Sequence, residues 1–242
     1  MTKLTAEKYR ELFKLRAEGK LGDMECTKRL FDVLKPLFSE KMSILDVSCG
    51  VGHYFRKVKE LGPLNYLGVD LDAKAIEIAD EVWKDYPNAS FKVMNASKLE
   101  LENNSYDIVY CYNLLLHLKD YKDVLKELLR VSRKYIIVRS LFDDEYCTTK
   151  HEASVDYKNV YSDGFFFYNT YARDDVRNFL INLGSFKIEF LDDNLKIPEN
   201  ELEKQAKLLE VNSNEFAKTG AEKLQEWKGL KLNYEILIIE KK

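Results

Sequence analysis

Two glycines and an aspartate stand at positions that suit nucleoside binding. The segment Asp46-Val47-Ser48-Cys49-Gly50-Val51-Gly52 follows a short apolar run, and its glycines let the backbone approach a ligand closely. A helix-like stretch comes next, so free N–H groups at its start would face the same ligand. Eighteen residues beyond Gly52, a second apolar run ends at Asp70, whose carboxylate can accept hydrogen bonds from both ribose hydroxyls. Together these residues predict a nucleoside site.

The same segment argues against a dinucleotide. A dinucleotide fingerprint requires a third glycine where this chain has Phe55, and a bulky ring there opposes close packing of helix on strand. Asp46, at the end of the first apolar run, suits a cationic amino group or a sulfonium better than a pyrophosphate. A nicotinamide or flavin cofactor is therefore disfavoured.

The elements that must position these residues alternate between strand and helix. Strands are expected at 44–47, 66–69, 91–94, 106–110 and 135–139, with helices at 54–61, 73–83 and 121–131 between them. Two helices precede this core within 5–38. After a long loop rich in aromatic residues come a helix near 174–183, a strand near 186–190, two amphipathic helices near 199–227 and a strand at 234–239.

This alternation predicts a doubly wound α/β fold. We expect a mostly parallel, seven-stranded sheet with helices on both faces and two extra N-terminal helices. The last two strands do not continue the βαβ alternation and are expected to close the sheet in antiparallel fashion. A chain of 242 residues suits a single domain. Its expected parts are a helical cap (1–40), a cofactor-binding core (41–142), an acceptor-side loop (143–173) and a C-terminal part (174–242) with a helical insertion at about 197–232.

Over roughly residues 40–142 the sequence resembles the class I S-adenosylmethionine-dependent methyltransferases. The family's first motif is an acidic residue followed by x-G-x-G-x-G, and Ser48 replaces its first glycine here. The resemblance implies that Gly50 and Gly52 pass beneath the methionine portion of S-adenosylmethionine and that Asp70 holds the ribose. It implies further cofactor contacts from Asp46, Leu71, Asn95, Ala96, Tyr112 and Asn113. Many members carry an acid in place of Asn95, which weakens the expected contact to the adenine amine.

Several residues are candidates for roles beside the cofactor. His117 is a candidate general base, since its ordinary pKa suits proton uptake near neutrality, although many members carry a His here without a catalytic role. Arg139, at the end of a predicted strand, either holds an anionic acceptor or extends to water. Arg16, rather than Tyr9, is expected to fold over the cofactor as part of a lid. The aromatic run at 157–171 is either core or the wall of an acceptor pocket.

The hypothesis that follows is methyl transfer to oxygen or nitrogen of a small-molecule acceptor, such as a sugar or other secondary metabolite. The alternatives are a cofactor-binding regulatory protein without turnover and an RNA or protein methyltransferase. A net charge of −3 argues against nucleic acid as a partner. No membrane association is expected, because no apolar run approaches the roughly 18 residues of a bilayer span. Four scattered cysteines favour a reducing cytoplasm, and no metal site is expected. The oligomeric state is not predicted.

Overall fold

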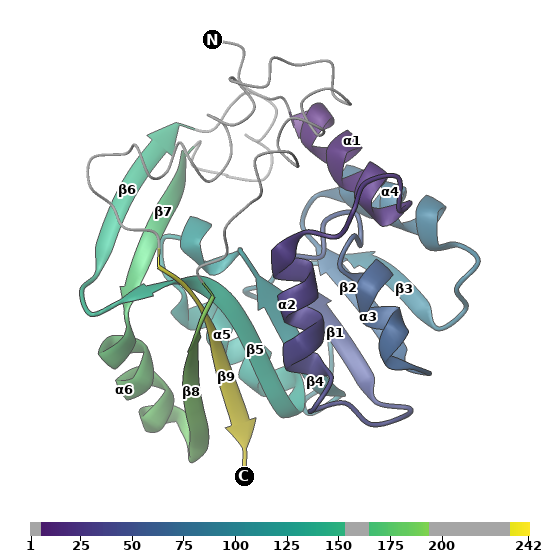
Figure 1. The fold of residues 1–242 in the computed structure, drawn as a ribbon. Coiled ribbons are helices and arrows are strands. Elements are labelled where there is room, and N and C mark those ends of the chain that lie inside the picture. The colour runs from purple at the N-terminus through teal and green to yellow at the C-terminus, as the bar shows by residue number, and fades with distance from the viewer. Residues whose placement is uncertain (1–5, 153–164, 194–232) are drawn as a thin grey trace.

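A parallel sheet forms the centre of the protein, in a computed structural model that describes residues 6–152, 165–193 and 233–242 (Figure 1). Its strands lie in the order β3-β2-β1-β4-β5, and every neighbouring pair among them is parallel. They are β1 (Ser43–Val47), β2 (Asn65–Asp70), β3 (Ala89–Val93), β4 (Tyr106–Tyr112) and β5 (Ser132–Asp143). The strand order reverses at β1, whose partners are β2 and β4. The predicted doubly wound core is confirmed.

The last strands close the sheet in antiparallel fashion, as predicted. β9 (Tyr234–Lys241) pairs with β5, and β8 (Phe186–Asp192) pairs with β9. Two further strands, β6 (Cys147–Glu152) and β7 (Phe165–Ala172), form a hairpin within the segment expected to be a loop. β5 extends beyond its pairing with β9, and its last residues, Leu141–Asp143, pair with β7. Within the described residues the sheet therefore has nine strands, two more than expected.

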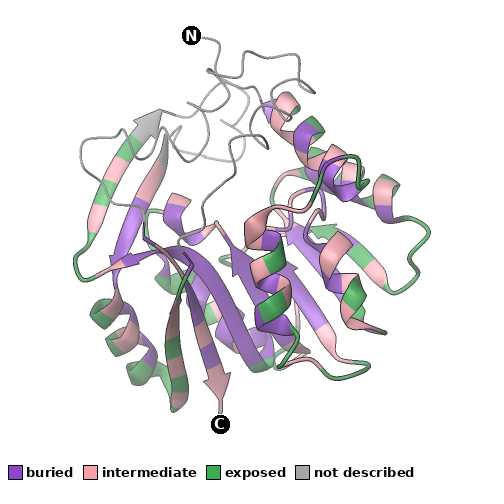
Figure 2. Ribbon diagram, viewed as in Figure 1, coloured by how far each residue is buried: buried purple, intermediate pink, exposed green. Residues whose placement is uncertain are grey.

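Helices cover both faces of the sheet (Figure 1). One apolar cluster joins the sheet to α1 (Ala6–Ala17), α2 (Glu25–Leu34), α3 (Phe55–Val58) and α4 (Ala73–Trp83). A second cluster, on the opposite face, joins it to α5 (Lys122–Val131) and α6 (Arg173–Leu183). The short 3-10 helices η1 (Lys59–Leu61) and η2 (Leu115–His117) complete the described elements. Figure 2 shows the central strands almost wholly buried between these layers, as expected for parallel strands covered on both faces.

Parts of the prediction lie outside the described residues. The two helices expected near 199–227 belong to this group, and so does most of the aromatic run at 157–171. Within the described ranges, no helix has the length and apolar character needed to cross a bilayer.

A buried ion pair ties β5 to the segment that follows β8. Arg139, in the middle of β5, donates through Nε to Asp193, whose side chain is fully buried. The Arg139 guanidinium also lies 3.9 Å from the centre of the Tyr234 ring on β9. Arg29 of α2 approaches Asp193 from the other side, at 3.7 Å between Nε and Oδ1. These contacts fix the antiparallel strands against the end of the parallel sheet.

Removing the acid of this pair is expected to destabilise the fold. Asp193→Ala leaves the Arg139 charge buried without its partner, so we expect the free energy of unfolding to fall by about 3–5 kcal/mol. Asp144→Ala is the matched control, because Asp144 is 91% exposed in its ion pair with Arg173 and should cost under about 1 kcal/mol. Urea denaturation of both variants measures the difference. Equal losses would contradict a structural role for the buried pair.

Candidate functional site

The loop after β1 turns back across the end of β2. Its residues Ser48, Gly50 and Gly52 have positive φ angles of 71°, 54° and 70°. The N–H groups of Ser48 and Cys49 both donate to the carbonyl oxygen of Val69, at 2.7 and 3.0 Å. A left-handed conformation at position 48 accounts for the glycine that the family motif places there, since glycine adopts it without a steric penalty. The loop is thus held against the neighbouring strand.

Asp70 connects this loop to the next helix. Its carboxylate accepts hydrogen bonds from the N–H of Gly50 at 2.8 Å and from the N–H of Asp72 at 2.9 Å. Burial raises the pKa of Asp70, and these two backbone donors act in the opposite direction. The Leu71 N–H is a third backbone donor to this carboxylate. A carboxylate has about four lone-pair sites, so it can still accept a hydrogen bond from a further donor. The glycine bend and Asp70 therefore lie side by side, and the Asp70 carboxylate can still accept a hydrogen bond from a ligand.

A cavity of about 460 Å³ opens beside Gly50 and Asp70. This volume lies within the range of small-molecule sites. A Cβ at Gly50 would meet no other atom within 4 Å, so the backbone there faces open space. The predicted site residues that line the cavity are Ser48, Gly50, Asp70, Leu71, Asn95, Ala96, Tyr112, Asn113 and His117. Segments following β1, β2, β3 and β4 are therefore brought together at one edge of the sheet.

Asp46 lies beneath this cavity and does not line it. Its side chain is buried, and one carboxylate oxygen accepts hydrogen bonds from the hydroxyls of Tyr66, at 2.6 Å, and Tyr110, at 2.8 Å. Burial raises the pKa of Asp46 to about 7, although both hydroxyls act to lower it. Direct contact between Asp46 and a cofactor, as expected from the sequence, is not supported by this geometry.

Gly52 supports the loop from below instead of lining the cavity. A Cβ at this position would lie 2.7 Å from a ring carbon of Phe91 and 2.9 Å from Nε1 of Trp83. The same indole nitrogen donates to the carbonyl oxygen of Gly52 at 3.1 Å. Only glycine fits between the loop and these two rings.

Two arginines expected at the site are directed elsewhere. Arg16 is buried and donates to the carbonyl oxygen of Gly22 at 2.7 Å, because the chain after α1 folds back over it. Tyr9, the less favoured candidate on the same helix, lines the cavity and Arg16 does not. Arg139 neither faces an acceptor nor reaches water: β5 continues past it, and Asp193 and Asn113 accept from its guanidinium. Neither arginine therefore lines the cavity in this structure.

His117 lines the cavity from η2. Its Nδ1 lies 3.1 Å from the carbonyl oxygen of Phe167 on β7, and burial lowers its pKa to about 4. The imidazole is therefore neutral at physiological pH. Since a carbonyl oxygen can only accept a hydrogen bond, Nδ1 carries the hydrogen and Nε2 carries the lone pair.

Several lining residues were not predicted from the sequence. They come from the two N-terminal helices, from the turn after the glycine loop and from the start of α4: Arg10, Phe13, Met24, Cys26, His53, Tyr54 and Asp72. Arg10 pairs with Asp72 at 2.8 Å, which places α1 beside the start of α4. His53 and Tyr54 directly follow the motif glycines, so their position in the sequence was the one available signal.

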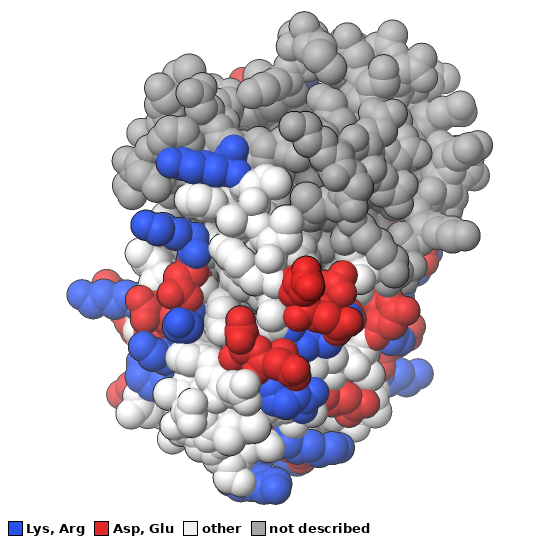
Figure 3. Space-filling view, turned by 90° about the vertical axis from the view of Figure 1, so that its left-hand side faces the viewer, with Lys and Arg blue, Asp and Glu red and all other residues white. Residues whose placement is uncertain are grey.

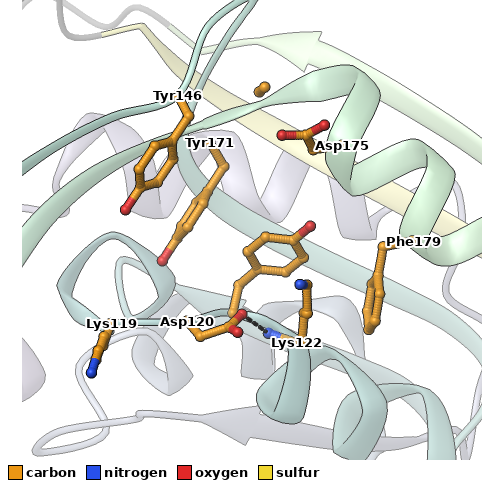
Figure 4. Close-up of a pocket in the computed structure, with 9 residues that line it drawn as sticks. Lys119, Asp120, Lys122, Tyr146, Tyr171, Asp175 and Phe179 are labelled. Atoms are coloured by element: carbon orange, nitrogen blue, oxygen red, sulfur yellow. Dashed lines mark hydrogen bonds between the residues drawn. The ribbon is translucent and has the colours of Figure 1, made fainter.

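A second cavity, of about 540 Å³, lies away from the predicted site (Figure 4). Tyr121, Tyr146, Tyr171 and Phe179 supply its aromatic side chains, and Asp175 lies at the start of α6 beside it. None of the predicted site residues lines it. Its lining comes from residues 119–122, from Tyr146 just before β6, and from β7 and α6, away from the loop after β1, so it has no relation to the glycine motif.

Comparisons with known proteins agree with this geometry. Residues 45–136 match a family described as a methyltransferase domain. The chain is 31% identical over 148 residues to demethylmenaquinone methyltransferase of Lactococcus lactis, which covers 54% of this chain and 56% of that protein. It is 24% identical over 137 residues to tRNA U34 carboxymethyltransferase of Campylobacter jejuni, covering 54% and 46%.

A solved structure extends the similarity to the fold. Phosphoethanolamine N-methyltransferase 2 of Haemonchus contortus, in complex with S-adenosylmethionine, superposes with a TM-score of 0.65 and 18% identity, covering 88% of this chain and 52% of that one. The curated relatives match over only 20% to 56% of their own length. The resemblance to class I methyltransferases is confirmed for the domain and its fold.

The two motif glycines are expected to respond differently to a methyl group. Gly52→Ala forces a Cβ against Phe91 and Trp83 at a positive φ, and should lower the free energy of unfolding by about 3 kcal/mol or more. Gly50→Ala, its matched control, meets open space and should cost only the about 1–2 kcal/mol of the left-handed conformation. Chemical denaturation compares them. A larger loss of unfolding free energy in Gly50→Ala than in Gly52→Ala would contradict our assignment of Gly52 to loop support and of Gly50 to the cavity lining.

The buried acid beneath the cavity predicts a pH dependence of stability. The pKa of Asp46 is about 7 in the folded chain and about 3.9 when unfolded, so between these values the folded state binds the proton more tightly. Relative to Asp46→Asn, the wild-type free energy of unfolding should fall as pH rises from about 4 to about 7. The slope should reach about 1.4 kcal/mol per pH unit. Urea denaturation of both proteins across this pH range tests the prediction. A difference in unfolding free energy that does not change with pH would exclude a raised pKa for Asp46.

Proposed function

We propose that this chain, whose residues 45–136 match a methyltransferase domain, is an S-adenosylmethionine-dependent enzyme that methylates oxygen or nitrogen of a small molecule. One observation carries the proposal: the Gly50 N–H is bonded to the Asp70 carboxylate at the adjacent ends of β1 and β2, beside an open cavity. Ligands of open α/β sheets bind at this edge, where strand order reverses.

The residues at this edge fit the cofactor. The missing side chain of Gly50 leaves room for the methionine portion, and the Asp70 carboxylate can accept a further hydrogen bond from a ribose hydroxyl. Leu71, 44% exposed beside Asp70, and Ala96 offer apolar contact to adenine. Asn95 lines the cavity and accepts the N–H of Ser97 through Oδ1 at 2.9 Å, so its amide NH₂ is the group it has left to offer a ligand.

The chain contributes alignment, exclusion of water and a neutral base. When bound, the cofactor supplies an electrophilic methyl group on a sulfonium. Tyr112 and Asn113 lie at the end of β4, where they border the acceptor, and His117 holds its Nδ1 hydrogen toward Phe167. In that tautomer Nε2 can take a proton from an acceptor hydroxyl or amine, and the lowered pKa makes His117 a weaker base than an ordinary histidine. Positioning of the reactants accounts for much of such a rate enhancement.

Surface charge favours a small acceptor over nucleic acid. Figure 3 shows Asp and Glu gathered beside Lys and Arg on one face, without a continuous basic surface there. The net charge of the chain is −3. Because affinity for nucleic acid depends on clustered Lys and Arg, this face is unsuited to RNA. Retention on RNA at physiological salt would favour the RNA alternative, and cofactor binding without turnover would favour a regulatory protein.

Calorimetric titration with S-adenosylmethionine tests the cofactor site. We expect binding by the wild type, and a dissociation constant raised roughly tenfold to a hundredfold in Asp70→Asn, because the charge that holds the ribose hydroxyls is lost. Asp85→Asn, at an exposed position outside the cavity, should bind like the wild type. The proposal fails if the wild type does not bind, and the role of Asp70 fails if both variants bind equally.

A further inference from the structure

The helix that carries His117 is too short to fix its own position. Within η2 (Leu115–His117) the N–H of His117 donates to the carbonyl oxygen of Leu114, and the N–H of Leu118 donates to that of Leu115. A single 3-10 turn is not stable in isolation, because nucleating it costs more free energy than its few hydrogen bonds contribute. The direction of the His117 ring therefore depends on contacts from elsewhere in the chain.

Strand β7 supplies such contacts through two side chains. Asn169 and Tyr171 are two residues apart in β7, so their side chains point to the same face of the strand. Tyr171 Oη donates to the carbonyl oxygen of Leu115 at 2.9 Å and lies 3.1 Å from that of Leu118. Nδ2 of Asn169 donates to the Leu118 carbonyl oxygen and, at 3.2 Å, to Tyr171 Oη. The end of η2 is thus tied to β7.

The donors of these two side chains are fully used in this cluster. Asn169 is 0% exposed and Tyr171 is 3% exposed. The two hydrogens of the Asn169 amide go to Leu118 and to Tyr171, and the one hydroxyl hydrogen of Tyr171 goes to the carbonyls of η2. Buried polar groups need such partners, since an unsatisfied one destabilises the fold. Both residues are therefore committed to η2 and to each other.

The same strand also contacts the His117 ring directly. The carbonyl oxygen of Phe167 lies 3.1 Å from Nδ1, and the ring of Tyr168 meets the imidazole edge-on with 4.9 Å between ring centres. The hydrogen bond to Phe167 can form only while η2 stays beside β7. The amide and the hydroxyl described above hold it there, so they decide which ring nitrogen carries the hydrogen.

We propose that Asn169 and Tyr171 are positioning residues, which hold η2 against β7 so that His117 keeps its hydrogen on Nδ1 and presents Nε2 to the methyl acceptor. This inference rests on the proposed function and adds to it the groups that orient the base. Neither residue lines the cavity beside Gly50 and Asp70, so they act through η2 and not by contact with a substrate.

Nuclear magnetic resonance of the histidine side chains tests this role. The chain has three histidines, and His117→Gln identifies the signals of His117. At neutral pH the nitrogen chemical shifts of an imidazole distinguish the nitrogen that carries hydrogen from the one that carries a lone pair. We expect wild-type His117 to carry its hydrogen on Nδ1 alone. Tyr171→Phe should lose this single form and populate both tautomers, because a released η2 moves His117 away from the Phe167 carbonyl.

Tyr121→Phe is the matched control for the hydroxyl. The Tyr121 ring packs against that of Tyr171, with 4.8 Å between ring centres, but the hydroxyl that binds the η2 carbonyls belongs to Tyr171. The control should therefore keep the wild-type tautomer of His117. Asn169→Leu removes the amide donors at similar volume and should behave like Tyr171→Phe. It carries the test if Tyr171→Phe does not fold.

The tautomer separates positioning from a purely structural role. A lowered Tm with His117 still wholly in the Nδ1–H form, in folded Tyr171→Phe or Asn169→Leu, would overturn the inference. Wild-type His117 with its hydrogen on Nε2, or Tyr121→Phe behaving like Tyr171→Phe, would overturn it too. Calorimetry should find the same S-adenosylmethionine affinity in all variants, since the bond between Gly50 and Asp70 involves no residue of β7. If the wild type does not bind this cofactor, the proposed function fails instead, and the tautomers of the cofactor-free chain still test the positioning.

Discussion

Parallel pairing of β1 with both of its neighbours is the constraint on which the cavity depends. Val47 lies in register with Val69 of β2 and with Cys111 of β4, so the residues that follow these strands emerge at one edge. The connections from β1 and to β4 lead to opposite faces of the sheet, which leaves a crevice between them. The hydrogen bond from Gly50 to Asp70 forms because these strand ends are adjacent. Both the loop conformation and the cavity beside it follow from this register.

Features encoded locally could be predicted from the sequence, and features set by packing could not. The glycine bend and Asp70 were identified by spacing, and the limits of α4 by its periodicity. In the structure Asp72 caps this helix through the N–H groups of Lys74 and Ala75. The length of β5 depends on distant partners, so Arg139 was placed at a strand end that lies further along. The rotation of α1 about its axis is set by its packing, and it presents Tyr9 to the cavity rather than Arg16.

Polar groups buried around the cavity serve two different purposes. Arg139 has its charge and hydrogen bonds satisfied within the protein by Asp193 and Asn113, and it holds strands together. Asp70, by contrast, lines the cavity and can accept a further hydrogen bond beyond those from its backbone donors. Burial alone therefore does not distinguish a structural group from one that recognises a ligand. The distinction lies in whether the hydrogen-bonding capacity of each group is already used.

β5 pairs first with β9 and then, at its C-terminal end, with β7, so these two parts of the sheet are attached to it separately. β9 pairs along Tyr135–Leu141, whereas among the described residues the β6–β7 hairpin pairs with β5 through Leu141–Asp143. The hairpin reaches the cavity through the Phe167 carbonyl beside His117 and does not contribute to the glycine loop or to Asp70. A change within the hairpin would therefore alter the support of the His117 ring while leaving the contact between Gly50 and Asp70 in place.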